Sequence, residues 1–289
     1  MDTRMAELGA SIVAAAGREL PVDGLLLSVV EAPTPPVASL ATPVFALVAQ
    51  GRKRLAVGDR VLEYGAGGYL VVSVDLPVTG HFTEASAAKP CLGVGLALRP
   101  DVIASLLLDH RPAGAATGFS VSKAPAELVD AVIRLLRLVD DPEDARVLAP
   151  MVEREILWRL LRGPNGATVR EIGLADSSLS HIGRAIRWIR DHSTEAFRVE
   201  ELAATAGMSS SAFHRHFRAV TALTPIQFQK KIRLREARLR VVGLGEDVTT
   251  AGYAVGYDSP SQFSREYRRE SGTPPSRDGS QLAAEPALP

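Results

Sequence analysis

Apolar residues change their spacing along the chain, and the changes separate regions of different predicted structure. Residues 1–20 predict a short helix that ends at Gly17. From about residue 20 to residue 100, short apolar and β-branched runs alternate with turn signals such as APTPP and GAGG. Many short strands at this spacing predict a small β barrel or sandwich.

From about residue 100 the apolar residues recur at helical spacing. Favourable i,i+4 pairs such as Asp130 with Arg134 support helices up to about residue 163. The stretch RGPNGATV breaks this pattern, so residues 166–178 are predicted to be a linker. Nearly continuous helices follow, and the whole chain is expected to be an α+β protein.

The last helical region contains one pattern twice, at an offset of 50 residues. The copies are SSSAFHRHFRAVTALTP and SPSQFSREYRRESGTPP. Each has a Ser that can cap a helix, two aromatic residues four apart that face a core, and an Arg that must then point outward. The matched positions are Ser209 with Ser259, Phe213 with Phe263, Arg215 with Arg265, Phe217 with Tyr267, and Pro225 with Pro275.

A further short helix and a Gly turn precede each copy. Gly207 and Gly256 stand at the two bends, and small residues such as Ala203 allow the paired helices to cross closely. A helix, a Gly-containing turn and a capped second helix form the helix-turn-helix pattern, which is predicted at about 199–220 and 248–270.

The helix between the two units, IQFQKKIRLREARLRVV, is rich in cations and has one acidic residue, Glu236. Such a helix would hold the two units rigidly, and its cations would either contact phosphates or form a solvated face. The basic residues are Lys230, Lys231, Arg233, Arg235, Arg238 and Arg240.

Composition adds a charge asymmetry to this picture. The 289 residues suggest one large or two ordinary domains, and the formal net charge is zero. Residues 1–180 carry 17 Lys and Arg against 21 Asp and Glu, whereas residues 181–275 carry 15 against 10. The basic second part indicates an anionic partner, although an excess of five charges is also compatible with ordinary scatter.

Cys91 is the single cysteine, so no disulfide framework is expected and a reducing cytoplasm fits. The N-terminal residues do not form a convincing signal peptide. No apolar run approaches the roughly 20 residues that a membrane span requires, so the protein is expected to be cytoplasmic and to have no membrane partner.

With these features, the chain resembles the AraC/XylS-type transcription regulators. The resemblance lies in LAATAGMSSSAFHRHFRAVTALTPIQFQKKIRLREAR and AGYAVGYDSPSQFSREYRRESGTPP. Residues 47–80 also resemble the N-terminal effector domain of one branch of that family, so the likeness covers roughly residues 20–276. Ser271 departs from the family pattern, which usually has Phe or another large residue there, and could loosen the last helix.

The resemblance implies an N-terminal cupin-like β barrel with a helical pair and a C-terminal all-α domain with two helix-turn-helix units. Its recognition helices would enter successive major grooves of double-stranded DNA. The predicted parts are an effector-binding and dimerisation domain at 1–165 (barrel about 20–100, helices about 100–163), a linker at 166–178, a DNA-binding domain at 179–276, and a disordered tail at 277–289.

The resemblance also assigns DNA-contacting residues. Arg is the best bidentate reader of guanine and Gln of adenine, so Arg215 and Arg265 are the strongest candidates. Arg269 is expected to contact phosphate, which sets affinity and register. The full set is Ser211, His214, Arg215, Arg218, Ser261, Gln262, Arg265, Arg268 and Arg269.

No cofactor, metal ion or catalytic residue is expected. A metal site needs convergent His and carboxylate ligands, yet the barrel region contains only His81, and His110 falls later. An apolar-lined barrel is instead a natural site for a small molecule, whose identity the sequence does not give.

A homodimer is the expected assembly, and RNA polymerase is a further candidate partner. Apolar stripes on the helices at 125–162 are the expected dimer surface, unless they cover the barrel. These stripes are Leu128, Val132, Leu135, Leu136 and Val139, and Ile156, Leu157, Leu160 and Leu161.

Two other classes of protein compete with a regulator. One is a cupin-type small-molecule enzyme with an appended helical domain, which metal analysis would test. The other is a helical module that binds acidic proteins. DNA binding through several phosphates would weaken steeply with salt, which separates the regulator from this module.

Overall fold

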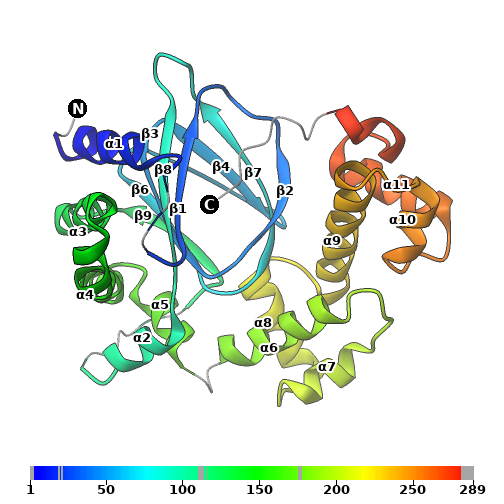
Figure 1. The fold of residues 1–289 in the computed structure, drawn as a ribbon. Coiled ribbons are helices and arrows are strands. Elements are labelled where there is room, and N and C mark those ends of the chain that lie inside the picture. The colour runs from blue at the N-terminus through cyan, green and yellow to red at the C-terminus, as the bar shows by residue number, and fades with distance from the viewer. Residues whose placement is uncertain are drawn as a thin grey trace.

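The computed structural model describes residues 3–18, 20, 22–109, 114, 116–174 and 178–280. Two antiparallel β-sheets form its centre, with α1, α3 and α4 on one side and α6 to α11 on the other (Figure 1). The five-stranded sheet has the order β1 (Leu25–Val30), β8 (Cys91–Ala97), β3 (Val44–Gln50), β6 (Gly68–Val72), β9 (Phe119–Lys123). The four-stranded sheet has the order β2 (Val37–Ala41), β7 (Leu76–Glu84), β4 (Arg52–Val57), β5 (Arg60–Gly65).

The helices fall into two groups along the chain, the first interleaved with the strands and the second after them. The predicted α+β fold, with an N-terminal β domain and a C-terminal helical domain, is confirmed. The first group is α1 (Thr3–Ala15), α2 (Pro100–Leu106), α3 (Ala126–Arg137), a 3₁₀ turn (Leu138–Asp140), α4 (Pro142–Arg162) and α5 (Gly166–Gly173). The second is α6 (Ser178–Asp191), α7 (Val199–Thr205), α8 (Ser210–Thr221), α9 (Pro225–Arg238), a π-helical turn (Leu239–Gly243), α10 (Val248–Ala254), α11 (Pro260–Ser271) and a 3₁₀ helix (Pro275–Ser280).

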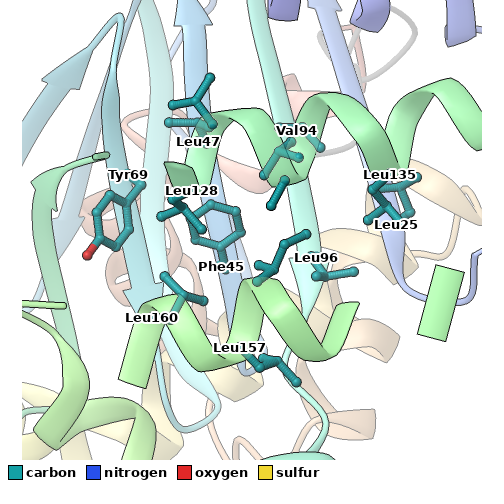
Figure 2. Close-up of a cluster of buried hydrophobic side chains, with 14 of the residues drawn as sticks. Leu25, Phe45, Leu47, Tyr69, Val94, Leu96, Leu128, Leu135, Leu157 and Leu160 are labelled. Carbon is teal, nitrogen blue, oxygen red and sulfur yellow. The ribbon is translucent and has the colours of Figure 1, made fainter. Parts of the chain in front are cut away.

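Helices α1, α3 and α4 cover the outer face of the five-stranded sheet. Figure 2 shows Leu128 and Leu160 beside Phe45 of β3. The apolar stripes expected to form a dimer surface are buried in this core, so that expectation is wrong. The stripes cover the sheet because its outer face is itself apolar and would otherwise be exposed.

Three segments differ from the prediction. The region expected to be helical from residue 100 contains β9, whose Phe119–Lys123 run is too short to give a periodic signal. The expected linker is helical at α5, because Ala167 and Val169 are buried against the first domain. The expected disordered tail begins with a 3₁₀ helix, in which Asp278 is buried; residues 281–289 lie outside the described residues.

A second core fills the space between the sheets and continues into the helical domain. Val57 and Phe119 of the sheets belong to the same apolar cluster as Phe217 of α8 and Ile186 of α6. The last helical pair has a separate small core around Phe263. The first helix-turn-helix unit is therefore packed on the β domain, whereas the second has a core of its own.

Candidate nucleic-acid interface

The first helix-turn-helix unit consists of α7 and α8. Gly207 has a φ of +67°, which suits a glycine at the bend between them. Ser209 caps α8, since its hydroxyl accepts a hydrogen bond from the backbone N–H of Ala212 at 3.3 Å. Both local predictions are confirmed.

The buried side of α8 determines which residues face solvent. Phe213 and Phe217 are fully buried, and Phe217 packs edge-on against Phe228 of α9 with ring centroids 5.6 Å apart. Residues three and four positions apart lie on the same helix face. With Phe213 and Phe217 on the buried face, the predicted DNA-contacting residues lie on the opposite face. Ser211, His214, Arg215 and Arg218 are all exposed on that face.

The second unit repeats this construction in α10 and α11. Gly256 has a φ of +84° at the bend, and the Ser259 hydroxyl accepts from the backbone N–H of Gln262 at 3.4 Å. Phe263 and Tyr267 are buried. The outward face of α11 carries Ser261, Gln262, Arg265, Arg268 and Arg269, all of them exposed.

The end of α11 is well fixed despite the departure at Ser271. The Ser271 hydroxyl donates to the carbonyl oxygens of Tyr267 at 2.8 Å and Thr273 at 2.9 Å. Gly272 follows in the left-handed conformation, with a φ of +77°. The loosening expected from a small residue is therefore offset by hydrogen bonds that a large apolar side chain could not form.

Helix α9 joins the two units, and most of its cations pair within the protein. Lys230 Nζ lies 2.8 Å from Glu266 Oε1, and Lys231 pairs with Glu270, both acids being on α11. Thr224 and Gln227 begin the helix with a capping box. The sequence suggested that these lysines either contact phosphates or lie on a solvated face. In the structure they instead form ion pairs with α11.

The arginines of α9 also act within the domain. Arg233 donates to the carbonyl oxygen of Gly256 at 2.7 Å, at the bend of the second unit. Arg238 pairs with buried Asp278 at 2.8 Å. These bonds could not be predicted from the sequence, because the partners lie 23 and 40 residues away along the chain. The helix holds the second unit in place through polar contacts.

The β domain contacts the first unit beside its exposed face. Asp59, in the turn between β4 and β5, has an Oδ2 atom 3.8 Å from a guanidinium nitrogen of Arg218. A Cβ added at Gly58 would lie 2.3 Å from the carbonyl oxygen of Ala222. One added at Gly118 would lie 2.0 Å from that of Val220. Sequence reasoning missed this interface, whose glycines resemble ordinary turn residues.

A second ion pair joins the domains at α6. A guanidinium nitrogen of Arg190 lies 2.5 Å from Asp75 Oδ2. Burial raises the pKa of Asp75, and the charges of Arg190 and Arg187 oppose that rise. The carboxylate of this ion pair is largely shielded from solvent, because the Asp75 side chain is 11% exposed.

The β domain has an open cleft where a small molecule could bind. Its volume is about 930 Å³, and its lining includes Met5, Gly51, Tyr64 and Val121.

Within the described ranges, no group of three or more His, Cys, Asp or Glu could hold a metal ion. His110 lies outside the described residues. In the described part of the chain, no helix has both the length and the apolar character to cross a membrane.

Both domains match known families. The family model of the AraC-type transcriptional regulator N-terminus matches residues 21–168, and a helix-turn-helix domain model matches residues 202–279. The chain is thus a two-domain protein of the DNA-binding class, with paired helix-turn-helix units behind a β domain. It belongs to the AraC-type transcriptional regulators.

Individual relatives are more distant. The HTH-type transcriptional activator RhaS of Klebsiella pneumoniae (strain 342) is 24% identical over 58% of this chain and 59% of its own length. RhaS of Escherichia fergusonii is 28% identical over 50% and 51%. The chain thus spans between half and three fifths of these curated relatives.

Solved structures of ToxT from Vibrio cholerae share the fold. Unsaturated fatty acid-bound ToxT of strain SCE256 has a TM-score of 0.55 at 12% identity, covering 92% of this chain and 98% of its own. ToxT of strain O395 has a TM-score of 0.57 at 10% identity, covering 91% and 100%.

Proposed function

We propose that this chain is a sequence-specific DNA-binding transcription regulator that reads two successive major grooves. The observation that carries the proposal is the pair of Ser-capped helices, α8 and α11, each with its arginines on an exposed face. A face with these side chains suits the major groove, where Arg reads guanine and Gln reads adenine.

The roles within each face follow from side-chain chemistry. Arg215 and Arg265 occupy equivalent positions and would contact bases, with Ser211, His214 and Ser261 beside them. Gln262 would read adenine, although its amide now donates to Glu266 at 3.3 Å. Arg218, Arg268 and Arg269 would contact base edges or phosphates at the ends of the two helices. Phosphate contacts set register, and base contacts set sequence.

We assign the β domain to effector binding. Its cleft lies in the domain that the AraC-type N-terminal model matches. ToxT, which shares the fold, has been solved with an unsaturated fatty acid bound. An effector would regulate this chain by favouring one placement of the helical domain on the β domain, and it can do so only by binding that placement more tightly.

We also propose that the chain forms a homodimer. Its interface would be a surface other than the apolar stripes of α3 and α4, which are buried. Val147 and Met151 lie four residues apart on the outer side of α4 and are 63% and 64% exposed. Exposed apolar residues that cluster in this way favour a protein contact.

The name of RhaS, a transcriptional activator, supports RNA polymerase as a further partner. A DNA partner supports a cytoplasmic location, and the family supports a binding role over an enzymatic one.

Binding of the purified chain to its own upstream DNA tests the function, measured across a salt series with random competitor. A regulator should prefer upstream fragments, and its affinity should fall steeply with salt because several phosphates are neutralised. Salt-independent binding, or equal binding to the competitor, would contradict the proposal. Metal analysis of the same preparation tests the cupin-type enzyme.

A further inference from the structure

Helix α9 lies between the two helix-turn-helix units, with α6 and α8 on one side and α10 and α11 on the other (Figure 1). On the first side, Phe228 packs against Phe217 of α8. On the second side, Lys230 and Lys231 pair with acids of α11. These contacts attach each unit to α9, so the units could still tilt about the helix unless a further contact joins them directly.

The two units touch where the loop before the first unit meets the bend of the second. Residues 193–195 belong to the loop that joins α6 to α7, and the bend is at Gly256. A Cβ added at Gly256 would lie 2.5 Å from the carbonyl oxygen of Thr194. The two backbones are therefore in close contact, with no room for a side chain between them.

The guanidinium of Arg233, on α9, bonds to both sides of this contact. Its Nε donates to the carbonyl oxygen of Ser193 at 2.5 Å, and one terminal nitrogen donates to that of Glu195 at 3.2 Å. The other terminal nitrogen donates to the carbonyl oxygen of Gly256 at 2.7 Å. A guanidinium presents its donors in a rigid planar fork, so three bonds to two segments hold those segments at one angle.

Gln229 supports the same loop from one turn earlier on α9. Its side chain is buried, and its amide nitrogen donates to the carbonyl oxygens of Ser193 at 2.9 Å and Glu195 at 2.6 Å. Two side chains of α9 therefore fix the loop. Of the two, Arg233 also reaches the second unit.

The angle at this contact sets the angle between the recognition helices. The loop at 193–195 leads into α7 of the first unit, and the bend at Gly256 leads into α11 of the second. Each base pair turns B-DNA by about 35° and advances it by about 3.4 Å. A pair of units held at one angle therefore matches one separation of two half-sites.

We propose that Arg233 is a positioning residue that restricts the protein to DNA whose two half-sites have one particular spacing. Its guanidinium is held by backbone carbonyls, so it acts through the angle between α8 and α11 rather than by touching a base. This inference rests on the proposed function and adds a second requirement on the DNA, the half-site spacing, to the bases that are read.

Competition binding to a set of DNA fragments tests the spacing requirement. The parent fragment is the upstream site that footprinting identifies, and two derivatives have one base pair added or removed between the protected segments. The unsubstituted chain should bind the parent at least about tenfold more tightly than either derivative, because deforming the DNA to restore alignment costs free energy. Equal binding to all three fragments would overturn the proposal.

Two substitutions test Arg233 itself. Arg233→Lys keeps the charge, but a compact ammonium cannot replace the fork that bonds to both segments, so the preference for the parent should fall to within about threefold. Arg233→Met removes all three bonds and should have the same effect. Circular dichroism shows whether the Met variant is folded, and the Lys variant decides if it is not. A folded variant that keeps the tenfold preference would contradict the proposal.

Arg235→Met is the matched control. Arg235 lies two positions further along α9, where it lines a cleft together with Pro35 and Pro36 of the β domain. Removing its charge can weaken a phosphate contact, which acts alike on every spacing, so the preference for the parent should remain. Loss of the preference in this control as well would assign the effect to the charge of α9 and overturn the role of Arg233.

The same titrations separate this inference from the function on which it rests. A chain that prefers upstream DNA to random competitor but accepts every spacing remains a regulator and loses only the fixed spacing. A chain that prefers no upstream fragment loses the regulator, and this inference with it.

Discussion

At the scale of single residues, the buried Lys53 lowers the stability of the fold. Burying an ammonium without a counter-ion favours the unfolded chain, where water surrounds the charge. Its pKa is about 8 in the folded protein against 10.5 for the ordinary group. The unfolded chain therefore binds more protons between these values, and the stability of the fold rises with pH across that window.

Lys53→Met should stabilise the protein at pH 7, because it removes this cost and keeps the volume. The gain over the unsubstituted chain should be largest below pH 8 and should shrink by on the order of 3 kcal/mol towards pH 10.5. Urea unfolding of both proteins from pH 7 to 10 measures this difference in the free energy of unfolding. Parallel pH profiles would show that Lys53 is not desolvated in the folded state.

The outward arginines give a prediction about DNA. Arg265→Ala should weaken binding to the specific site by about 1–3 kcal/mol, because one bidentate base contact is lost. Binding to random DNA should change much less, and competition titrations on both DNAs measure the difference. An equal loss on both would reassign Arg265 to a phosphate.

Local chemistry explains which residues could be predicted. Ser209, Ser259, Gly207 and Gly256 act on residues a few positions away, so their roles can be inferred from the adjacent sequence. The inward position of Lys53 could not, because it depends on which strands become its neighbours.

At the scale of elements, α9 acts as a clamp between the two helix-turn-helix units. Asp278 of the final 3₁₀ helix accepts from Arg238 at 2.8 Å and from the hydroxyl of Tyr267 at 2.7 Å. Burial works against the ionisation of Asp278, but these hydrogen bonds outweigh it and keep its pKa below the ordinary value. The pair therefore stabilises the fold at neutral pH, and this contribution disappears as Asp278 becomes protonated at low pH.

Asp278→Asn should destabilise the second unit by about 3 kcal/mol, because it removes the buried carboxylate that accepts from both Arg238 and the Tyr267 hydroxyl. Denaturant unfolding followed by circular dichroism measures the loss. The control is Glu236→Gln, which removes the exposed partner of Arg240 and should cost less than about 0.5 kcal/mol. Similar effects of the two changes would contradict a special role for Asp278.

The elements that were missed share one property. Strand β9 is five residues long and α5 is eight, so neither gives a periodic pattern long enough to recognise. Both are stabilised by burial against distant parts of the first domain. The long helices α3 and α4 could be predicted from the sequence. Their packing partner, the outer face of the five-stranded sheet, could not, because it depends on the tertiary fold.

At the scale of the whole molecule, the β domain and the first helix-turn-helix unit share a tight interface. Gly118 lies against the end of α8, and its carbonyl oxygen accepts from the backbone N–H of Ser73 at 2.9 Å. The chain at Gly118 is thus held on one side and has no room for a side chain on the other. This contact is a direct route by which a change in the β domain could move α8.

Gly118→Ala should push α8 away from the β domain at a cost of about 1–3 kcal/mol, as overpacking does in other cores. Amide hydrogen exchange should increase in the turn at 57–60 and at 217–223. Gly243→Ala is the matched control, because nothing lies within 4 Å of its added Cβ. Unchanged exchange in Gly118→Ala would show that the interface adapts without loosening.

Footprinting of the full chain on its own upstream DNA tests the central claim most directly, with Arg215→Ala and Arg265→Ala in parallel. Two helix-turn-helix units that read successive grooves should protect two segments about one helical turn, or ~34 Å, apart. Each variant should lose protection chiefly at one of the two segments. A single protected segment, or the same loss at both segments in each variant, would contradict reading by two units.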